Sequence, residues 1–563
     1  MARPLTLLAV LHGVLACSLA AAPRAPQDTT ALRRNVDSLF AEWDAPGSPG
    51  GAVVLTHHGS VILTRTYGLA DLEHRVPITR TTRFELASVS KPFTAFAVLL
   101  LEQAGRLRLD DDIHRYFPEL PDYGAPITVA DLLHHTSGLS DWVDVLPYAG
   151  RPIRAGFSLD DLLRLVARQR VLEFEPGAMW SYSNTNYALL AELVARATDT
   201  PFGEWTRENV FEPLGMRNTS FPVDGTRVLP DRAQAYTRES GGGYVRSLVE
   251  EFEIPGPAHA FSTIDDMARW VDNFRTGRVG GLELIAKMQE RPTLATGQRS
   301  FYGAGVGMGE YRATRTVVHS GQTGSFKSEL LYCPDLGVGV VVLASAGWMP
   351  ATDLVYRVLD LYQGDALEPR PQVSPAAAAP AERPFLDLDP ARYEPFLGGY
   401  RLDADPSVLL AAARDGQWLV GAIQAVGMDL FRPVAPAEFE NRSRNARLAF
   451  VDEDGDGVTE RLHVTLRGEE MWATRVQLPR DAPPVQDFVG LYYSDELDAA
   501  WELVLGPDGL AVRTPDSERP LHRADTDVVV GGLGILTFRR DADGRIVGFD
   551  FGEPENLNQR LIR

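Results

Sequence analysis

The sequence predicts an α/β (α+β) domain followed by two small all-β domains that resemble barrels, and three observations support this fold class. Strand-like runs and amphipathic helical stretches alternate over residues 30–363. A stretch rich in proline and alanine, without periodicity, follows at 364–390. Beyond it, a pattern of short alternating strands occurs twice. With 563 residues the chain is long enough for this division into domains.

Composition and charge restrict the class of protein. Hydrophobic residues make up 44% and charged residues 23% of the chain, which are ordinary values for a folded globular protein. The formal net charge of −21 repels polyanions, and no cluster of basic residues counteracts it, so we expect no nucleic-acid partner. The basic residues are almost all arginine. The lysines Lys91, Lys287 and Lys327 are therefore of special interest.

Residues 1–20 are predicted to be a signal peptide. Arg3 is followed by an apolar run and by small residues up to Ala20, the pattern of an export signal with its cleavage site. We therefore expect export to the periplasm or the extracellular space. The alternative is a lipoprotein acylated at Cys17. The apolar run is shorter than the roughly 20 residues that a helix needs to cross a bilayer, so we expect no membrane span.

The main domain, residues 30–363, begins with a predicted hairpin and ends with predicted strands. "GGAVVLTHHGSVILTRTYG" (50–68) has two β-rich arms around a turn. "NYALLAELVARATD" (186–199) and "STIDDMARWVDNFR" (262–275) carry apolar residues at helical spacing. The strand candidates near the end are "TRTVVHSG", "FKSELLYC" and "GVGVVVLAS". Once the signal peptide is removed, Cys333 has no disulfide partner in the chain, and we expect a buried small hydrophobe.

The region after the linker is predicted to form two β-barrel-like domains, residues 391–480 and 485–563. "EPFLGGYRLD" (394–403) is echoed by "QDFVGLYYSD" (486–495), and Asp/Gly turns follow in both units. The turn "DEDGDG" (452–457) resembles the start of a calcium loop. Because His463 stands where such a loop has its bidentate acid, we expect a simple turn.

Three short motifs carry candidate chemistry. Lys91 follows Ser88 by three residues at the start of an apolar helix, so the two side chains lie on one face and can touch. An arginine could not replace Lys91 as a proton acceptor, because its guanidinium stays charged. Tyr182 and Asn184 stand just before a predicted helix, and His319 and Gly321 stand at the end of a predicted strand.

Together, Ser88-x-x-Lys91, Tyr182-x-Asn184 and His319-x-Gly321 resemble the three boxes of the serine β-lactamase and penicillin-binding-protein superfamily. The segments "ITVADLLHHTSGLSDW" and "VFEPLGMRNTSF" resemble those of class C β-lactamase-related serine hydrolases. The resemblance covers roughly residues 35–350. It implies an antiparallel sheet flanked by helices.

The resemblance also implies a role for each residue of the boxes. Ser88 would be the nucleophile that is acylated, and Lys91 and Tyr182 would share the acid and base work. Asn184 would hold Lys91 and the substrate. The backbone N–H groups of Ser88 and Gln322 would form the oxyanion hole. The resemblance implies neither a metal nor an organic cofactor.

The third box departs from the pattern of most β-lactamases, which have Lys-Thr-Gly where this chain has His319-Ser320-Gly321. A neutral imidazole binds the substrate carboxylate poorly. A His-x-Gly box followed by two β-barrels resembles the D-aminopeptidase branch, which acts on peptides with N-terminal D-residues, and related exported esterases share the boxes. We therefore expect a serine hydrolase acting on a D-amino-acid peptide or an ester. The alternatives are an inactive binding or sensor protein on the same fold, and a true β-lactamase.

Two histidine pairs, His57-His58 and His134-His135, lack acidic or cysteine neighbours at metal-binding spacing. We interpret both pairs as parts of surface turns and expect no metal site.

Overall fold

The computed structural model describes residues 29–149, 157–222, 228–239, 241–247, 254–364, 366–369, 383–423, 427–442, 445–466, 469–507, 509–514, 517–552 and 559–563. The predicted signal peptide, with Cys17, lies outside the described residues, as does most of the predicted linker. None of the helices in the described ranges is long and apolar enough to cross a membrane.

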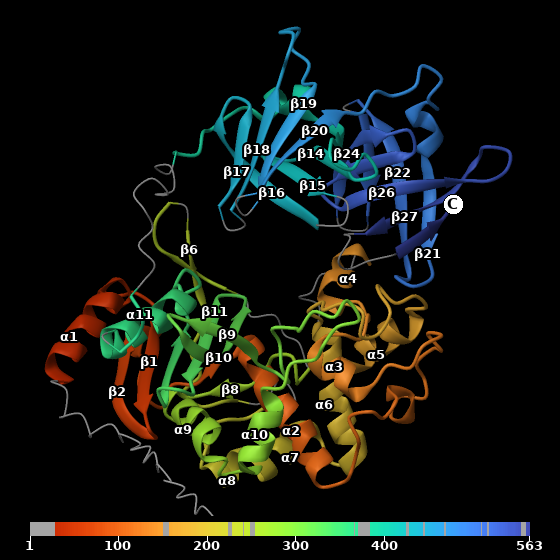
Figure 1. Ribbon diagram of the computed structural model, residues 1–563. Helices are drawn as coiled ribbons and strands as arrows, with labels where there is room; N and C mark the ends of the chain where they lie inside the picture. Colours follow the sequence, from red (N-terminus) through yellow and green to blue (C-terminus); the bar gives the residue numbers. More distant parts are fainter. Residues whose placement is uncertain are drawn as a thin grey trace, which may run out of the picture.

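The first domain is built on a six-stranded antiparallel sheet with helices on both faces, which confirms the predicted fold class (Figure 1). In sheet order the strands are β2 (Ser60–Tyr67), β1 (Gly51–His57), β12 (Val338–Ala344), β11 (Phe326–Cys333), β10 (Thr314–Thr323) and β9 (Gly307–Tyr311). The predicted hairpin is β1 and β2, and the predicted strand triplet is β10 to β12. The first and last strands of the domain's sequence therefore meet in the middle of the sheet.

The remaining elements of this domain are helices and short strand pairs. The helices are α1 (Thr29–Phe40), η1 (Ala41–Asp44), η2 (Ala87–Ser90), α2 (Lys91–Gln103), η3 (Ile113–Arg115), α3 (Val129–His134), α4 (Trp142–Tyr148), α5 (Leu159–Arg168), α6 (Asn184–Thr198), α7 (Phe202–Thr206), η4 (Arg207–Phe211), α8 (Glu212–Leu214), α9 (Ile264–Thr276), α10 (Gly281–Met288) and α11 (Ala351–Gln363). The short pairs are β3 (Leu69–Asp71) with β4 (Val76–Pro77), β5 (Phe84–Glu85) with β8 (Phe261–Ser262), and β6 (Tyr236–Arg238) with β7 (Tyr244–Arg246).

Successive side chains of the central strands point to opposite faces of the sheet and so contribute to two hydrophobic layers. In β1, Val53 and Leu55 face the layer under α1 and α11, while Ala52 and Val54 face the layer that contains α2, α6 and α9. Cys333 is buried in the first layer, as predicted. Because both faces are covered, the sheet forms a rigid support for residues at the ends of its strands.

Two closed eight-stranded barrels follow, as the repeat predicts. The first contains η6 (Pro390–Phe396), β13 (Gly398–Leu402), β14 (Leu409–Asp415), β15 (Trp418–Ile423), β16 (Gly427–Ala435), β17 (Glu438–Asn441), β18 (Ala446–Val451), β19 (Arg461–Leu466) and β20 (Glu469–Arg475). The second contains η7 (Val485–Phe488), β21 (Gly490–Ser494), β22 (Ala499–Gly506), β23 (Gly509–Arg513), β24 (Glu518–Asp525), β25 (Val528–Gly531), β26 (Gly534–Arg540), β27 (Ile546–Gly552) and β28 (Gln559–Ile562).

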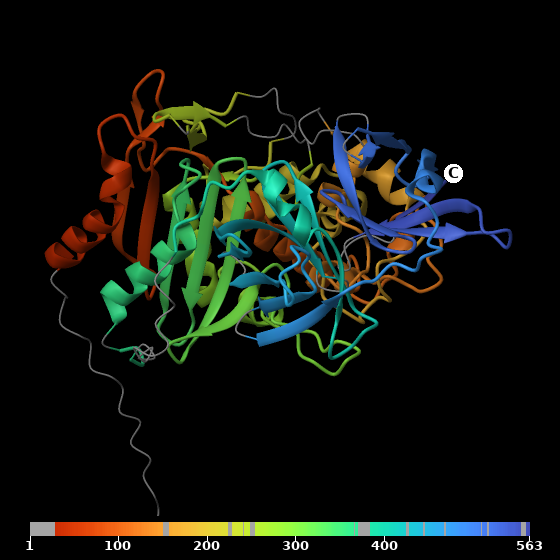
Figure 2. The same cartoon turned by 90° about the horizontal axis from the view of Figure 1, so that it is seen from above.

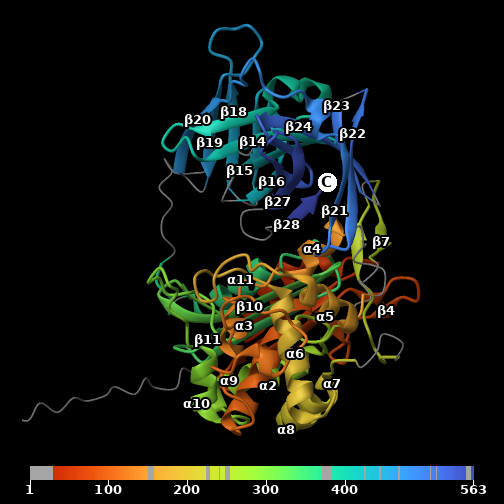
Figure 3. The same cartoon turned by 90° about the vertical axis from the view of Figure 1, so that its right-hand side faces the viewer.

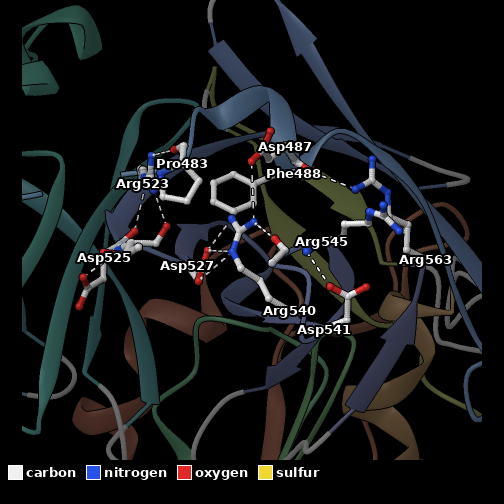
Figure 4. A network of polar contacts seen from close by, with 12 residues as sticks. Pro483, Asp487, Phe488, Arg523, Asp525, Asp527, Arg540, Asp541, Arg545 and Arg563 are labelled. Atoms are coloured by element: carbon white, nitrogen blue, oxygen red, sulfur yellow. Dashed lines mark hydrogen bonds and ion pairs between the residues drawn. The ribbon is translucent and has the colours of Figure 1, made fainter. Parts of the chain in front are cut away.

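The same corner stabilises each barrel. In the first, the buried Tyr400 hydroxyl donates to the Phe396 carbonyl at 2.8 Å, and Arg475 donates to the Leu397 carbonyl at 2.7 Å. The second barrel repeats these contacts at equivalent positions: Tyr492 donates to the Phe488 carbonyl at 2.7 Å, and Arg563 donates to the Val489 carbonyl at 2.6 Å. Figure 4 shows Phe488 and Arg563 of this second corner, near which Arg540 approaches Asp487. Equivalent residues of the sequence repeat thus form equivalent hydrogen bonds in the two barrels.

The barrels contact each other, and the second barrel contacts the first domain. Leu409 and Ala411 of β14 share a small hydrophobic cluster with Ala524 and Val530 of the second barrel. The second barrel lies against α4, as Figures 1 and 3 show together. Figure 2 shows the same molecule from above.

In the "DEDGDG" turn, the carboxylate oxygens of Asp452, Asp454, Asp456 and Glu460 lie within 4.8 Å of one another. The fourth of these acids is Glu460. It stands three residues before His463, the position at which a calcium loop has its bidentate acid. The turn itself is formed by backbone N–H groups, such as those of Gly455 and Gly457, which donate to Asp452.

Candidate active site

Ser88 lies in a tight turn between β5 and α2. The turn, η2, includes Ala87 in the left-handed region with φ at 47°, a conformation that costs a non-glycine residue free energy. The Leu86 N–H donates to the Ala260 carbonyl at 2.8 Å and anchors the turn. Ser88 remains partly exposed while Ala87 and Val89 are buried. The turn therefore presents one serine hydroxyl to the solvent side.

Lys91 is the first residue of α2, and its side chain is completely buried. Its Nζ donates to Ser88 Oγ at 3.1 Å, to Asn184 Oδ1 at 2.8 Å and to the Pro257 carbonyl at 2.9 Å. These three acceptors use all the donors of an ammonium group. Burial lowers the pKa of Lys91 to about 7, although the nearby Asp141 acts in the opposite direction. Lys91 can therefore exchange a proton with Ser88 near neutral pH.

The other lysines have different surroundings. Lys287 forms an ion pair with Glu102 at 2.5 Å, and Lys327 donates to the side chain of Gln322. Lys91 alone of the three is fully buried.

Tyr182 and Asn184 approach the same two residues from the start of α6. The Tyr182 hydroxyl is hydrogen-bonded to Ser88, and the Lys91 Nζ lies 4.6 Å from the centre of the Tyr182 ring. Burial raises the pKa of Tyr182, so the phenol is neutral at ordinary pH. The first two boxes thus meet around one serine oxygen.

The third box lies on β10, directly beside Ser88. A Cβ added to Gly321 would lie 2.3 Å from the Leu86 carbonyl oxygen and 3.1 Å from the Ser88 nitrogen. Only a glycine lets the strand approach the turn this closely.

From His319 onward, one edge of strand β10 is unpaired beside Ser88 in the described part of the chain. β9 pairs with β10 only from Thr314 to Val318, and no strand in the described part of the chain pairs with that edge further on. Thr323 and Phe326 face each other across a two-residue turn, so the N–H of Gln322 points away from β11. The N–H groups of Gln322 and Ser88 are therefore suited to stabilise an oxyanion.

His319 is buried and neutral. Its Nδ1 lies 2.7 Å from the Ser320 carbonyl, which can only accept, so Nδ1 carries the proton and Nε2 accepts from the Tyr302 hydroxyl at 2.9 Å. Burial and the positive charge of Lys91 lower the pKa of His319 to about 3. The third box consequently supplies no positive charge to a substrate near neutral pH.

His135 corrects a prediction. It is not part of a surface turn but completely buried, with its ring 4.6 Å from that of Tyr182. It ends α3 in the left-handed conformation, with φ at 59°, and this turns the chain inward under the Tyr182 box. Its Nδ1 accepts the Ser183 N–H at 3.2 Å. The only signal in the sequence was the segment "HTSGLSD", whose resemblance to related hydrolases assigned no role to His135.

Asp141 and Pro257 were also missed. Asp141 begins α4, is buried, and accepts from the backbone and side-chain N–H groups of Asn184 at 3.0 and 2.7 Å. Pro257 contributes only its carbonyl oxygen, which any residue type could supply.

The chain is similar to several known proteins. A family model described as Beta-lactamase matches residues 35–361. The D-aminopeptidase of Brucella anthropi is 26% identical over 545 residues, covering 93% of this chain and 96% of the relative. The D-amino acid amidase from Ochrobactrum anthropi SV3, in complex with L-phenylalanine amide, is 25% identical with a TM-score of 0.50, covering 60% of this chain and 99% of that structure. The octameric penicillin-binding protein homologue from Pyrococcus abyssi shares the fold at 20% identity, with a TM-score of 0.53, covering 78% of this chain and 99% of that one.

Proposed function

The chain belongs to the Beta-lactamase family and is a serine hydrolase, and we propose that it cleaves amide bonds next to D-amino acids through an acyl-Ser88 intermediate. The observation that carries the proposal is the 3.1 Å contact between Lys91 Nζ and Ser88 Oγ, in a site that lowers the pKa of Lys91 to about 7.

In the proposed mechanism, neutral Lys91 accepts the proton of Ser88 as Oγ attacks the substrate carbonyl carbon. The oxygen of the tetrahedral intermediate accepts from the N–H groups of Ser88 and Gln322. Tyr182, hydrogen-bonded to Ser88, relays the proton to the departing amine. Water then attacks the acyl-enzyme, with the same groups acting in reverse.

Two findings support an amide next to a D-residue as the substrate. The relative named D-aminopeptidase aligns with 93% of the chain. The structure named D-amino acid amidase aligns with 60% of the chain. Against a β-lactam as the main substrate, neutral His319 offers no positive charge to the carboxylate of such a compound.

We also propose that the protein is exported. This rests on the sequence of residues 1–20 alone. N-terminal sequencing of protein from the periplasmic or culture fraction should find the first residue close to position 21.

The test combines a Ser88→Ala variant with a serine-directed fluorophosphonate and a pair of substrates, the p-nitroanilides of D- and L-alanine. We expect one adduct on the parent by intact mass, hydrolysis of the D compound only, and loss of both in the variant. A Ser60→Ala variant, which changes an exposed serine of β2, should behave as the parent. A parent that forms no adduct would refute the mechanism. An adduct without cleavage of the D compound would refute the substrate alone.

A further inference from the structure

We propose that Asp141 is a positioning residue of this site: its carboxylate orients the Asn184 amide toward Lys91 and provides the counter-charge of the Lys91 ammonium. The inference rests on the proposed function, because it concerns Lys91 as the base. It assigns a role to a residue outside the three boxes.

The contacts form a chain of three side chains with alternating donors and acceptors. Lys91 Nζ donates to Asn184 Oδ1 at 2.8 Å, and Asn184 Nδ2 donates to Asp141 Oδ2 at 2.7 Å. Asp141 Oδ2 also accepts the Asn184 backbone N–H at 3.0 Å, and Oδ1 accepts the Val143 N–H at 3.1 Å. Asp141 thus accepts three N–H groups, which is the pattern of an ionised carboxylate.

This chain fixes the orientation of an amide that could otherwise rotate. If the Asn184 amide turned over, Nδ2 would face the Lys91 ammonium and Oδ1 would face the Asp141 carboxylate. Both contacts would then be repulsive, donor against donor and acceptor against acceptor. Asp141 therefore selects the orientation that leaves an oxygen for Lys91.

Lys91 has no other charged neighbour among the described groups that face it. Burial lowers the pKa of His135 and of His319, and raises the pKa of Tyr182, Tyr187 and Tyr302, so all five are neutral near pH 7. Glu173 is close enough to Asp141 for their charges to interact, and burial raises the pKa of Glu173 to about 9, so it is neutral as well. Burial raises the pKa of Asp141, while the N–H groups of Asn184 and Val143 and the charge of Lys91 act in the opposite direction. These contacts favour the Asp141 carboxylate as the negative charge that faces Lys91.

An asparagine at position 141 would remove both contributions while keeping the size of the side chain. Its oxygen could still accept the Val143 N–H, but its NH2 group would face the two N–H donors of Asn184. The Asn184 amide would then turn over, and Lys91 would lose an acceptor and its counter-charge. Loss of an opposite charge at this range favours the neutral amine.

The experiment compares the parent with Asp141→Asn by the rate of fluorophosphonate labelling of Ser88 as a function of pH, followed by intact mass. In the parent we expect the rate to rise with pH around a midpoint near 7, since burial sets the pKa of Lys91 to about 7. In the variant we expect the midpoint to fall by about one pH unit or more. Amide hydrolysis should fall at least about 100-fold, because the Asn184 oxygen is misplaced.

The matched control is Asp161→Asn, which neutralises an aspartate in the first turn of the neighbouring helix α5, where it accepts from Ser158 and pairs with Arg164. Its midpoint should equal that of the parent. Thermal unfolding shows whether each variant is folded. If Asp141→Asn does not fold, Asp141→Ser takes its place, since serine can still cap the Val143 N–H without carrying a charge.

The outcomes separate this inference from the proposed function. A parent that is not labelled at Ser88 refutes the proposed function, and this inference with it. A labelled parent and a folded Asp141 variant with an unchanged midpoint refute the inference alone, as does an equal shift in Asp161→Asn. A shift confined to position 141 supports it.

Discussion

At the scale of single residues, the closest constraint on the site is Gly321. A Cβ at this position would lie 2.3 Å from both the Leu86 carbonyl oxygen and Ser328 Oγ, so either β10 or the turn that carries Ser88 has to move. We expect Gly321→Ala to lower kcat/KM at least about 100-fold, since displacement of a nucleophile by an ångström costs that much. Steady-state kinetics and fluorophosphonate labelling measure the effect.

The control for Gly321→Ala is Gly309→Ala on β9. A Cβ there would meet only the end of the Thr316 side chain, at 3.1 Å. Its activity should stay close to that of the parent. Parental activity in Gly321→Ala would mean that the strand does not constrain Ser88.

The residues of the three boxes could be located from the sequence because their spacing is short and fixed. The groups around them could not. The Pro257 carbonyl is backbone and has no signature in residue type. His135 forms a left-handed turn at the end of α3, and the segment after this turn brings Asp141 to the site. Their role depends on tertiary contacts, which no local pattern records.

At the scale of elements, the hydrogen bond between a buried tyrosine and a 3-10 turn is the feature that both barrels share. We expect Tyr492→Phe to lower the free energy of unfolding of the second barrel by about 1 kcal/mol, because the Phe488 carbonyl loses its donor while the ring stays in place. Urea denaturation, followed by the fluorescence of the buried Trp501, measures it.

Tyr493→Phe is the matched control for Tyr492→Phe. The hydroxyl of this neighbouring, exposed tyrosine donates to Asp498 at the surface. Its loss should change the free energy of unfolding by less than about 0.5 kcal/mol. An equal cost for both variants would contradict a special role for the buried corner.

The sequence predicted the duplication of these β domains but not how the barrels close. The echo of "EPFLGGYRLD" in "QDFVGLYYSD" identifies the equivalent tyrosines. Closure instead depends on the pairing of the first strand with the last, β13 with β20 and β21 with β28. Contacts between residues so far apart in sequence leave no local pattern.

At the scale of the whole molecule, α4 links the second barrel to the site. Its first turn is capped by Asp141, and its last residue, Tyr148, packs on Phe551 with ring centres 5.0 Å apart. Trp501 Nε1 donates to the Tyr148 carbonyl at 2.9 Å. Val145 and Ala149 belong to the hydrophobic cluster of the barrel. The barrel therefore stabilises the helix on which the Asp141 carboxylate depends.

Two kinds of contact stabilise this interface, and they contribute different amounts of free energy. The Tyr148 ring contributes apolar burial worth about 1–2 kcal/mol for a half-buried side chain. The ion pair of Arg168 with Asp498 at 2.8 Å is partly exposed, and such pairs contribute about 0–1 kcal/mol. We therefore expect Tyr148→Ala to loosen the second barrel and Arg168→Ala to leave it docked.

Small-angle scattering and the rate of Ser88 labelling measure the two consequences of Tyr148→Ala. We expect a larger radius of gyration, and also slower labelling at pH values well above 7, where the protonation of Lys91 no longer limits the rate, because α4 and its Asp141 cap lose support from the barrel. The Trp501 hydrogen bond remains available to the variant, since it uses the backbone carbonyl, so the barrel itself should stay folded. If Arg168→Ala had the larger effect, charge rather than apolar packing would hold the domains together. If labelling were unchanged in a visibly expanded Tyr148→Ala protein, the barrel would be independent of the site.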